Sequence, residues 1–258
     1  MIKFFRKIRQ KMLSENKFNK YLIYAIGEII LVVIGILIAL QINNWNEGEK
    51  LKKEEIKILQ NFEKSLNEDL TRTEWVTEQY LLTKNSISIL VNHLEQNLPY
   101  NDSLNTHFGR ITQTWTPRIN TEVFETLKSI NLNLISKENL RNEIVQYYSY
   151  SNNILNDDID RYVNTIENAS KNIFNTRFNA LWNGNYKKWE MTENVEDLEL
   201  EMIPNNFDEL KNDKEFLYFL RSLKNIFYWH IERNQLKIKR DAESLIQNIN
   251  VELENKQN

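Results

Sequence analysis

The chain has 258 residues, of which 41% are hydrophobic and 27% are charged, and its formal net charge is −3 at pH 7. This composition is enough for one domain of ordinary size plus an accessory segment, and it excludes an intrinsically disordered chain. Only 5 Gly and 3 Pro leave few tight turns, which favours long helices over an all-β or α/β architecture. The absence of Cys excludes disulfides, thiolate metal sites and cysteine nucleophiles.

The first segment, residues 1–20, is strongly basic. It carries seven Lys and Arg residues against Glu15 alone, which gives a charge of +6, and the positive-inside rule predicts that this end stays in the cytoplasm. Its apolar residues recur at helical spacing, so the leader is also suited to lie flat against anionic headgroups. Nucleic-acid binding is disfavoured, because residues 43–258 hold 26 basic and 34 acidic side chains, a net charge of −8.

Residues 21–42, YLIYAIGEIILVVIGILIALQI, form an apolar run long enough to cross a bilayer. As a helix, these 22 residues extend about 33 Å at a rise of about 1.5 Å per residue, against a hydrocarbon core of about 30 Å. A cleaved signal peptide is the alternative, and it is disfavoured because the run is too long and no small-residue cleavage site follows it. We therefore predict a single transmembrane helix over residues 21–42, with residues 43–258 outside the cytoplasm.

Residues 1–47 resemble the opening of a bacterial family of single-pass membrane proteins that is known as a domain of unknown function. The FRKIRQ leader, the YAIGEIILVVIGILIAL span and the INNWNE exit carry this resemblance, which strongly covers about a fifth of the chain. It implies a membrane-anchored protein of Gram-negative bacteria and brings no catalytic residues. Together with the charge asymmetry, it predicts a span in the inner membrane, a cytoplasmic N-terminus and a periplasmic C-terminal domain.

Glu28 is the one ionisable residue of the predicted span, where a charge costs on the order of 2.5 to 3.5 kcal/mol. Gly35 and Ala39 fall on the same helical face, at a small-xxx-small spacing that permits close approach of helices. One interpretation is an intramembrane contact of Glu28, Gly35 and Ala39 with a partner helix. The other is that Glu28 snorkels to the cytoplasmic headgroups and has no further role. Both interpretations stay open.

Beyond residue 43 the apolar pattern is helical almost throughout. A near-heptad stripe, typical of coiled coils, predicts a helix to about residue 98, and two further long helices are predicted near 136–181 and 213–252. Short helices near residues 104–111 and 123–130 and an acidic loop over about 183–207 complete the pattern. We predict an all-α fold in which the transmembrane helix is followed by an extracytoplasmic antiparallel bundle of three long and one or two short helices.

No catalytic, cofactor-binding or metal-binding residue is predicted. The three His, at positions 93, 107 and 230, stand in no metal-binding spacing, and the sequence lacks a Gly-rich phosphate loop and a nucleophile elbow, so an enzyme is not expected. One polar cluster, His230, Asn234 and Asp241, lies on the stripe of the last helix. It forms either a satisfied buried network, which we favour, or a pocket for a small polar ligand.

These features favour a membrane-anchored interaction or scaffold module of the cell envelope. Its expected partners are the lipid bilayer and either an envelope protein or a second copy of the chain, with no nucleic acid. The alternative is an extracytoplasmic ligand-sensing bundle that signals through a partner, because 20 cytoplasmic residues are too few for an output domain. A filled core with an exposed apolar patch favours the first function, and a polar-lined pocket favours the second.

Overall fold

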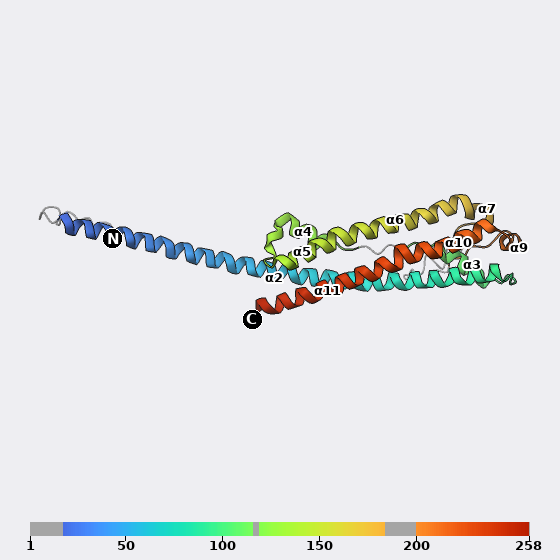
Figure 1. Ribbon diagram of the computed structural model, residues 1–258, viewed down its shortest axis with the longest axis horizontal. Coiled ribbons are helices and arrows are strands. Elements are labelled where there is room, and N and C mark those ends of the chain that lie inside the picture. Colours follow the sequence, from blue (N-terminus) through green and yellow to red (C-terminus); the bar gives the residue numbers. More distant parts are fainter. Residues whose placement is uncertain (1–17, 116–118, 184–199, 258) are drawn as a thin grey trace. The chain divides into compact units, whose positions relative to one another are not determined.

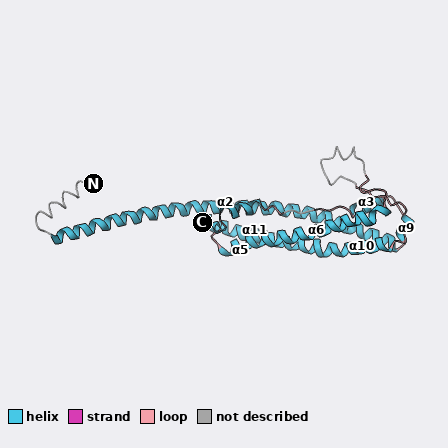
Figure 2. Cartoon of the chain, turned by 90° about the horizontal axis from the view of Figure 1, so that it is seen from above, coloured by secondary structure: helices cyan, strands magenta, loops and turns pink. Residues whose placement is uncertain are grey.

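The computed structural model describes residues 18–115, 119–183 and 200–257 of the chain (Figure 1). In this part of the chain all regular elements are helical, and Figure 2 shows them with short connecting loops. The chain separates into two compact units, Met1–Ile56 and Lys57–Asn258. The elements in chain order are α2 (Phe18–Glu95), α3 (Ser103–Arg110), α4 (Glu122–Ile130), η1 (Leu132–Leu134), α5 (Glu138–Gln146), η2 (Tyr147–Ser151), α6 (Asn152–Ala169), η3 (Ser170–Phe174), α7 (Asn175–Arg177), α9 (Phe207–Lys211), α10 (Lys214–Ile226), η5 (Phe227–Glu232) and α11 (Arg233–Gln257). The all-α prediction is confirmed.

Helix α2 contains the predicted transmembrane segment. Its described Leu, Ile and Val side chains between residues 22 and 42 are all exposed, from 45% for Leu22 to 72% for Ile23, so none of these described side chains is buried within the chain. Among the described residues, α2 is the one helix that is long and apolar enough to cross a membrane, by length and composition. We call the second unit, Lys57–Asn258, the packed unit. Helix α2 continues without a break from the apolar stretch into the packed unit, so no change in secondary structure marks the predicted boundary at residue 42.

The end of α2 has a local cause in the sequence. Asn97 adopts a left-handed conformation with a φ of 54°, which Asn tolerates better than most residues. The N–H of Leu98 then bonds to the carbonyl oxygen of His93 at 3.0 Å, the long closing bond of a Schellman turn. Pro99 follows and cannot continue the helix.

Three aromatic side chains from three helical segments meet in the core of residues 57–257. Tyr80 of α2, Tyr162 of α6 and Phe227 of η5 are each at most 1% exposed. The ring of Tyr80 lies 5.7 Å from that of Tyr162 and 5.3 Å from that of Phe227, both edge to face. This geometry is favourable for aromatic pairs and adds to the burial of their large apolar area. The core is therefore filled by side chains at the level where the long helices meet.

The contacts also give the directions of the long helices. The consecutive elements α5, η2 and α6 form one long helix, which we call the α5–α6 helix. Phe62 of α2 packs against Tyr148, and the later residue Tyr80 packs against the later residue Tyr162, so α2 and the α5–α6 helix run in the same direction. Lys239 pairs with Glu74 whereas Arg221 pairs with Glu95, so the α10–α11 helix runs antiparallel to α2. The predicted antiparallel arrangement therefore holds between α2 and the last long helix. It is wrong for α2 and the second long helix, which are parallel.

The parallel pair results from the connection after α3. Tyr80 donates a hydrogen bond to the carbonyl oxygen of Trp115, and Asn120 donates its main-chain N–H to Asp69. The chain therefore returns along α2 toward lower residue numbers before α4 begins. Among the described residues no long helix lies between α3 and α5, and the chain passes Tyr80 before it reaches Asp69. Helix α5 therefore starts near the end of the packed unit where residue 57 lies, and it runs parallel to α2.

Two of the predicted long helices contain π-helical turns. The run from Glu138 to Arg177 includes η2 and η3, and the run from Lys214 to Gln257 includes η5. A π-turn inserts one residue and shifts the phase of the helix surface. At η2 this shift allows both Tyr147 and Tyr148 to be buried, at 5% and 2% exposure.

Candidate functional site

A groove lies between the second half of α2 and the helix formed by η5 and α11, which are neighbours in Figures 1 and 2. Its volume is about 560 Å³, within the range of small-molecule sites. We call it the α2–α11 groove, and its lining consists of Thr73, Glu74, Trp75, Thr77, Glu78, Tyr80 and Leu81 from α2, Phe227, Ile231 and Glu232 from η5, and Gln235, Leu236 and Lys239 from α11.

The groove has a buried floor and an exposed apolar rim. The floor side chains are at most 9% exposed and are Thr73, Tyr80, Phe227, Ile231 and Gln235. On the rim, Leu81 is 49% exposed and Leu236 is 56% exposed. Exposed Leu side chains facing a hollow offer apolar area that an occupant can cover, at roughly 25 cal/mol per Å².

Two ion pairs bracket the groove along the helices. Lys239 donates to Glu74 at 2.8 Å, and Lys84 donates to Glu232 at 2.7 Å. Both pairs join α2 to the antiparallel helix, one on each side of the groove along the helix axes. The hydrogen bond and the charge of Glu74 raise the pKa of Lys239, although this exposed pair adds little stability.

Gln235 is the central polar residue of the groove floor. It is 3% exposed, and its Oε1 lies 2.6 Å from the hydroxyl of Thr77. That hydroxyl also lies 2.7 Å from the carbonyl oxygen of Thr73. Since Thr77 has one hydroxyl proton, it donates to only one of these oxygens at a time.

One end of the Gln235 amide has no hydrogen-bond partner. Within the described part of the chain, Nε2 is buried and unpaired. If Thr77 donates to Thr73, the amide must turn over and donate Nε2–H to Thr77, and then Oε1 is the unpaired atom. The floor of the groove therefore contains a buried polar atom without a hydrogen-bond partner in either orientation.

A second buried polar position is Asp69 on α2. It is 3% exposed, and its two carboxylate oxygens accept the main-chain N–H of Asn120 at 3.1 and 3.0 Å. Burial raises its pKa to about 6, although the hydrogen bond from Asn120 and the charge of Arg72 act in the opposite direction. Burial and the nearby Asp69 charge also raise the pKa values of Tyr147 and Tyr148. We interpret Asp69 as an anchor for the returning chain.

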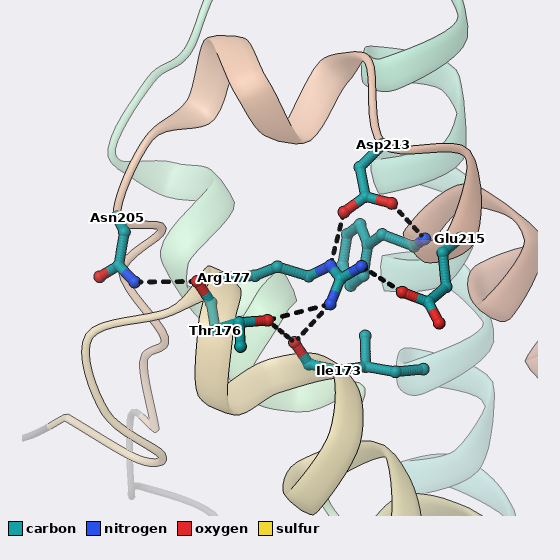
Figure 3. A network of polar contacts seen from close by, with 7 residues as sticks. Ile173, Thr176, Arg177, Asn205, Asp213 and Glu215 are labelled. Atoms are coloured by element: carbon teal, nitrogen blue, oxygen red, sulfur yellow. Dashed lines mark hydrogen bonds and ion pairs between the residues drawn. The ribbon is translucent and has the colours of Figure 1, made fainter.

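Arg177 forms a polar network at the end of α7, shown in Figure 3. Its Nε donates to Asp213 and one terminal nitrogen donates to Glu215, each at 2.5 Å. Asp213 also caps α10 by accepting the N–H of Phe216 at 2.9 Å. Although burial alone raises the pKa of Asp213, the hydrogen bonds from Arg177 and Phe216 hold it below its usual value. The network joins α7 to α10 and is a structural feature.

The predicted polar cluster of the last helix lies beside the core. Asp241 is partly exposed, pairs with Lys237 at 2.5 Å and lines a small hollow of about 180 Å³ with residues of α5 and η2. Asn234 lies on the first turn of α11 and is half-buried. His230 lies in η5, but its side chain is outside the described part of the structure. Whether the three residues form one network stays a prediction.

The candidate intramembrane residues lie on the apolar stretch of α2. Glu28 is half-buried, and Ala39 is exposed. A Cβ added to Gly35 meets no atom within 4 Å, so the helix surface at Gly35 is open. Their contact with a partner helix stays a prediction.

The other two His residues lie near each other on α2 and α3. His107 Nδ1 is 2.9 Å from the hydroxyl of Ser86, and burial, followed by the charges of Arg110 and His93, lowers its pKa. Among the described residues, no group of three or more His, Asp or Glu is placed to hold a metal ion.

Asp69 and Gln235 were not identified from the sequence, although a signal was present. Asp69 follows Phe62 and Leu66 at helical spacing, on the predicted apolar stripe of α2. Gln235 also lies at helical spacing from an apolar residue of the predicted stripe, Ile238. The π-turn η5, however, shifts the buried face of the helix by one residue before Gln235. The predicted residues Asn234 and Asp241 therefore lie one position before the buried residues Gln235 and Ala242.

Comparison with known proteins gives one result. The model of a family of unknown function, DUF6090, matches residues 28–185, which is 158 of 258 residues and includes most of α2 and the helices through α7. No curated protein and no solved structure matches the chain.

Proposed function

We propose, from the premise that this chain belongs to the family of unknown function DUF6090, that it is a membrane-anchored helical module of the bacterial envelope that docks another envelope protein. The apolar segment of α2 supports the anchor, because its large side chains are exposed over about 20 residues and a bilayer would cover them. The basic leader supports a cytoplasmic N-terminus, and the acidic remainder supports a periplasmic domain.

The natural absence of Cys allows a direct test of this topology. Lys3→Cys and Tyr218→Cys each introduce the only thiol of the chain, and Tyr218 is 73% exposed. In cells whose outer membrane has been opened, a maleimide that cannot cross the inner membrane is expected to label Tyr218→Cys alone. Detergent is expected to make both variants reactive. Labelling of Lys3→Cys in intact cells would contradict the orientation.

The docking role rests on an exposed aromatic pair on η5. Tyr228 is 51% exposed and Trp229 is 56% exposed, and their rings lie 5.4 Å apart. The guanidinium of Arg233 lies 5.5 Å from the centre of the Trp229 ring. Trp, Tyr and Arg are the residue types most enriched at interaction hot spots, and Phe227 and Ile231 already fill the core beside them. We name these three residues the η5 patch.

The η5 patch is tested by photo-crosslinking of the full chain in native membranes. A photoreactive phenylalanine analogue at position 229 is expected to give a discrete crosslinked species, and Arg233→Glu is expected to remove it. The same analogue at the more exposed position 218 is the matched control. Equal products at both positions, or a product that Arg233→Glu leaves unchanged, would contradict docking at this patch. Adding Glu28→Leu tests whether the same partner is also contacted within the bilayer.

Ligand sensing is the second candidate function. The observation that favours it is the α2–α11 groove, which combines an open apolar rim with an unsatisfied buried amide. A sensor of this architecture would pass its signal to a partner.

A further inference from the structure

We infer that the α2–α11 groove is a binding site for a small, neutral, apolar molecule that carries a hydroxyl group. This site is formed by other residues than the η5 patch, so it is separate from the proposed docking role. The inference rests on the second candidate function, ligand sensing, and names the class of ligand for it. The inference depends on the shape of the groove, the hydrogen-bonding state of Gln235 and the pairing of the surrounding charges.

The shape and lining of the groove fit a small apolar molecule. Sites for such ligands typically have volumes of about 300 to 1,000 Å³, apolar walls and a few placed polar groups. Trp75, Leu81 and Leu236 supply apolar area at the rim, and the volume of about 560 Å³ lies within that range. The floor below them is closed by the rings of Tyr80 and Phe227.

The hydroxyl group of the ligand is inferred from the hydrogen bonds of the Gln235 amide. Thr77 satisfies one end of the amide, and the other end is a donor in one orientation and an acceptor in the other. A hydroxyl group can accept or donate, so it can satisfy both orientations, whereas a carbonyl or an ammonium can satisfy only one. The last side-chain torsion of Gln is broad, so the amide can turn toward a ligand without leaving a rotamer well.

A purely structural role for Gln235 explains its buried, unpaired amide less well than a ligand-binding role does. A buried polar atom without a partner is unfavourable, and a Leu of similar size would fill the same space without that loss. Burial of the amide beneath an open apolar groove therefore has a reason if a ligand completes its hydrogen bonds.

The charges around the groove favour a neutral ligand. Glu74 is paired with Lys239, and Glu232 is paired with Lys84. Glu78 stands on the exposed part of the rim, away from the buried floor. The floor thus presents the uncharged side chains of Thr73 and Gln235, and a charged ligand would lose hydration without gaining a buried counter-charge.

Site-specific photolabelling tests the inference on the full chain in lipid nanodiscs. The probe is a trifluoromethyl-phenyl-diazirine that carries a hydroxymethyl group, and the matched probe is the same diazirine without that group. After irradiation, the labelled peptides are identified by mass spectrometry, so probe dissolved in the lipid does not obscure labelling at the groove. The hydroxymethyl probe is expected to label the segments 73–81 and 227–239 several-fold more strongly than the matched probe.

Two variants distinguish the groove from unspecific labelling. Gln235→Leu is expected to lower labelling by the hydroxymethyl probe by about threefold to tenfold, to the level of the matched probe. Leu236→Glu, at an exposed rim position, is expected to reduce labelling of both segments by both probes. Val251→Glu, at an exposed apolar position elsewhere on α11, is the control and is expected to leave labelling unchanged.

The inference is overturned if neither segment is labelled above background. It is also overturned if Leu236→Glu leaves labelling unchanged, or if the hydroxymethyl group and Gln235 make no difference. None of these outcomes bears on the topology or on crosslinking at position 229, so the proposed docking function can stand or fail separately.

Discussion

Asp69 on α2 holds the main chain of Asn120, 51 positions later in the sequence, through both of its carboxylate oxygens. This contact fixes the returning chain against α2 just before α4 begins. It therefore determines at which end of the packed unit the α5–α6 helix starts, and so the parallel direction of that helix. A buried carboxylate at such a point also makes stability depend on pH.

The first prediction concerns the pH dependence of unfolding. Because the pKa of Asp69 is about 6 in the folded chain, above its ordinary value of 3.8, the folded state binds this proton more tightly than the unfolded state. This contribution to stability is fully present below about pH 4 and is lost as the pH rises through about 6. One pKa unit corresponds to about 1.4 kcal/mol, so the loss is expected to reach about 3 kcal/mol.

Urea unfolding of the full chain in detergent micelles, followed from about pH 4 to about pH 8, measures this effect. Asp69→Asn keeps one acceptor for the Asn120 N–H and is expected to flatten the profile over that range. Asp208→Asn is the control, because the Asp208 side chain is 87% exposed, and it is expected to keep the wild-type profile. An unchanged profile in Asp69→Asn would show that another group is responsible.

The second prediction concerns Gly109 on α3. A Cβ at this position would lie 1.9 Å from the carbonyl oxygen of Leu200, so the backbone at Leu200 must move away in Gly109→Ala. We expect a loss of unfolding free energy on the order of 2 kcal/mol, as for other overpacked sites. Gly48→Ala is the matched control, since its Cβ would meet nothing within 4 Å, and it is expected to stabilise the helix by up to about 1 kcal/mol.

The third prediction concerns the Arg177 network. Arg177→Gln removes both ion pairs and leaves the Asp213 carboxylate with the main-chain hydrogen bonds that it accepts at the start of α10. Because Arg177 is 15% exposed, we expect a loss of about 1 to 3 kcal/mol in thermal or urea unfolding, between the values for surface and buried pairs. Arg221→Gln breaks the more exposed pair with Glu95 and is expected to cost less than about 1 kcal/mol. Equal losses in both variants would contradict the importance of burial.

The fourth prediction tests the anchor itself. Ile34→Arg places a charge near the centre of the apolar segment, where insertion scales assign a cost of about 2.5 to 3.5 kcal/mol. The fraction of the chain that resists carbonate extraction from membranes is expected to fall sharply. Leu51→Arg, at an exposed position nine residues beyond Ile42, is expected to leave that fraction at the wild-type level.

Several features of the fold follow directly from the pattern of residues. The scarcity of Gly and Pro and the helical apolar spacing predict the helices, and Asn97 with Pro99 accounts for the end of α2. The length and composition of residues 21–42 identify a long apolar helix near the N-terminus. These are local properties, because each depends on residues within a few turns of one another.

The sequence by itself therefore determined an all-helical chain with an apolar N-terminal segment and the approximate extent of its helices. The tertiary structure alone decided the parallel direction of α2 and α6, since that depends on contacts of the returning chain with Tyr80 and Asp69. It also decided that Gln235 is the buried amide of the last helix. A π-turn changes helical phase by one residue, and the packing of Phe227 against Tyr80 and Tyr162 sets that phase in a way that helical periodicity alone cannot predict.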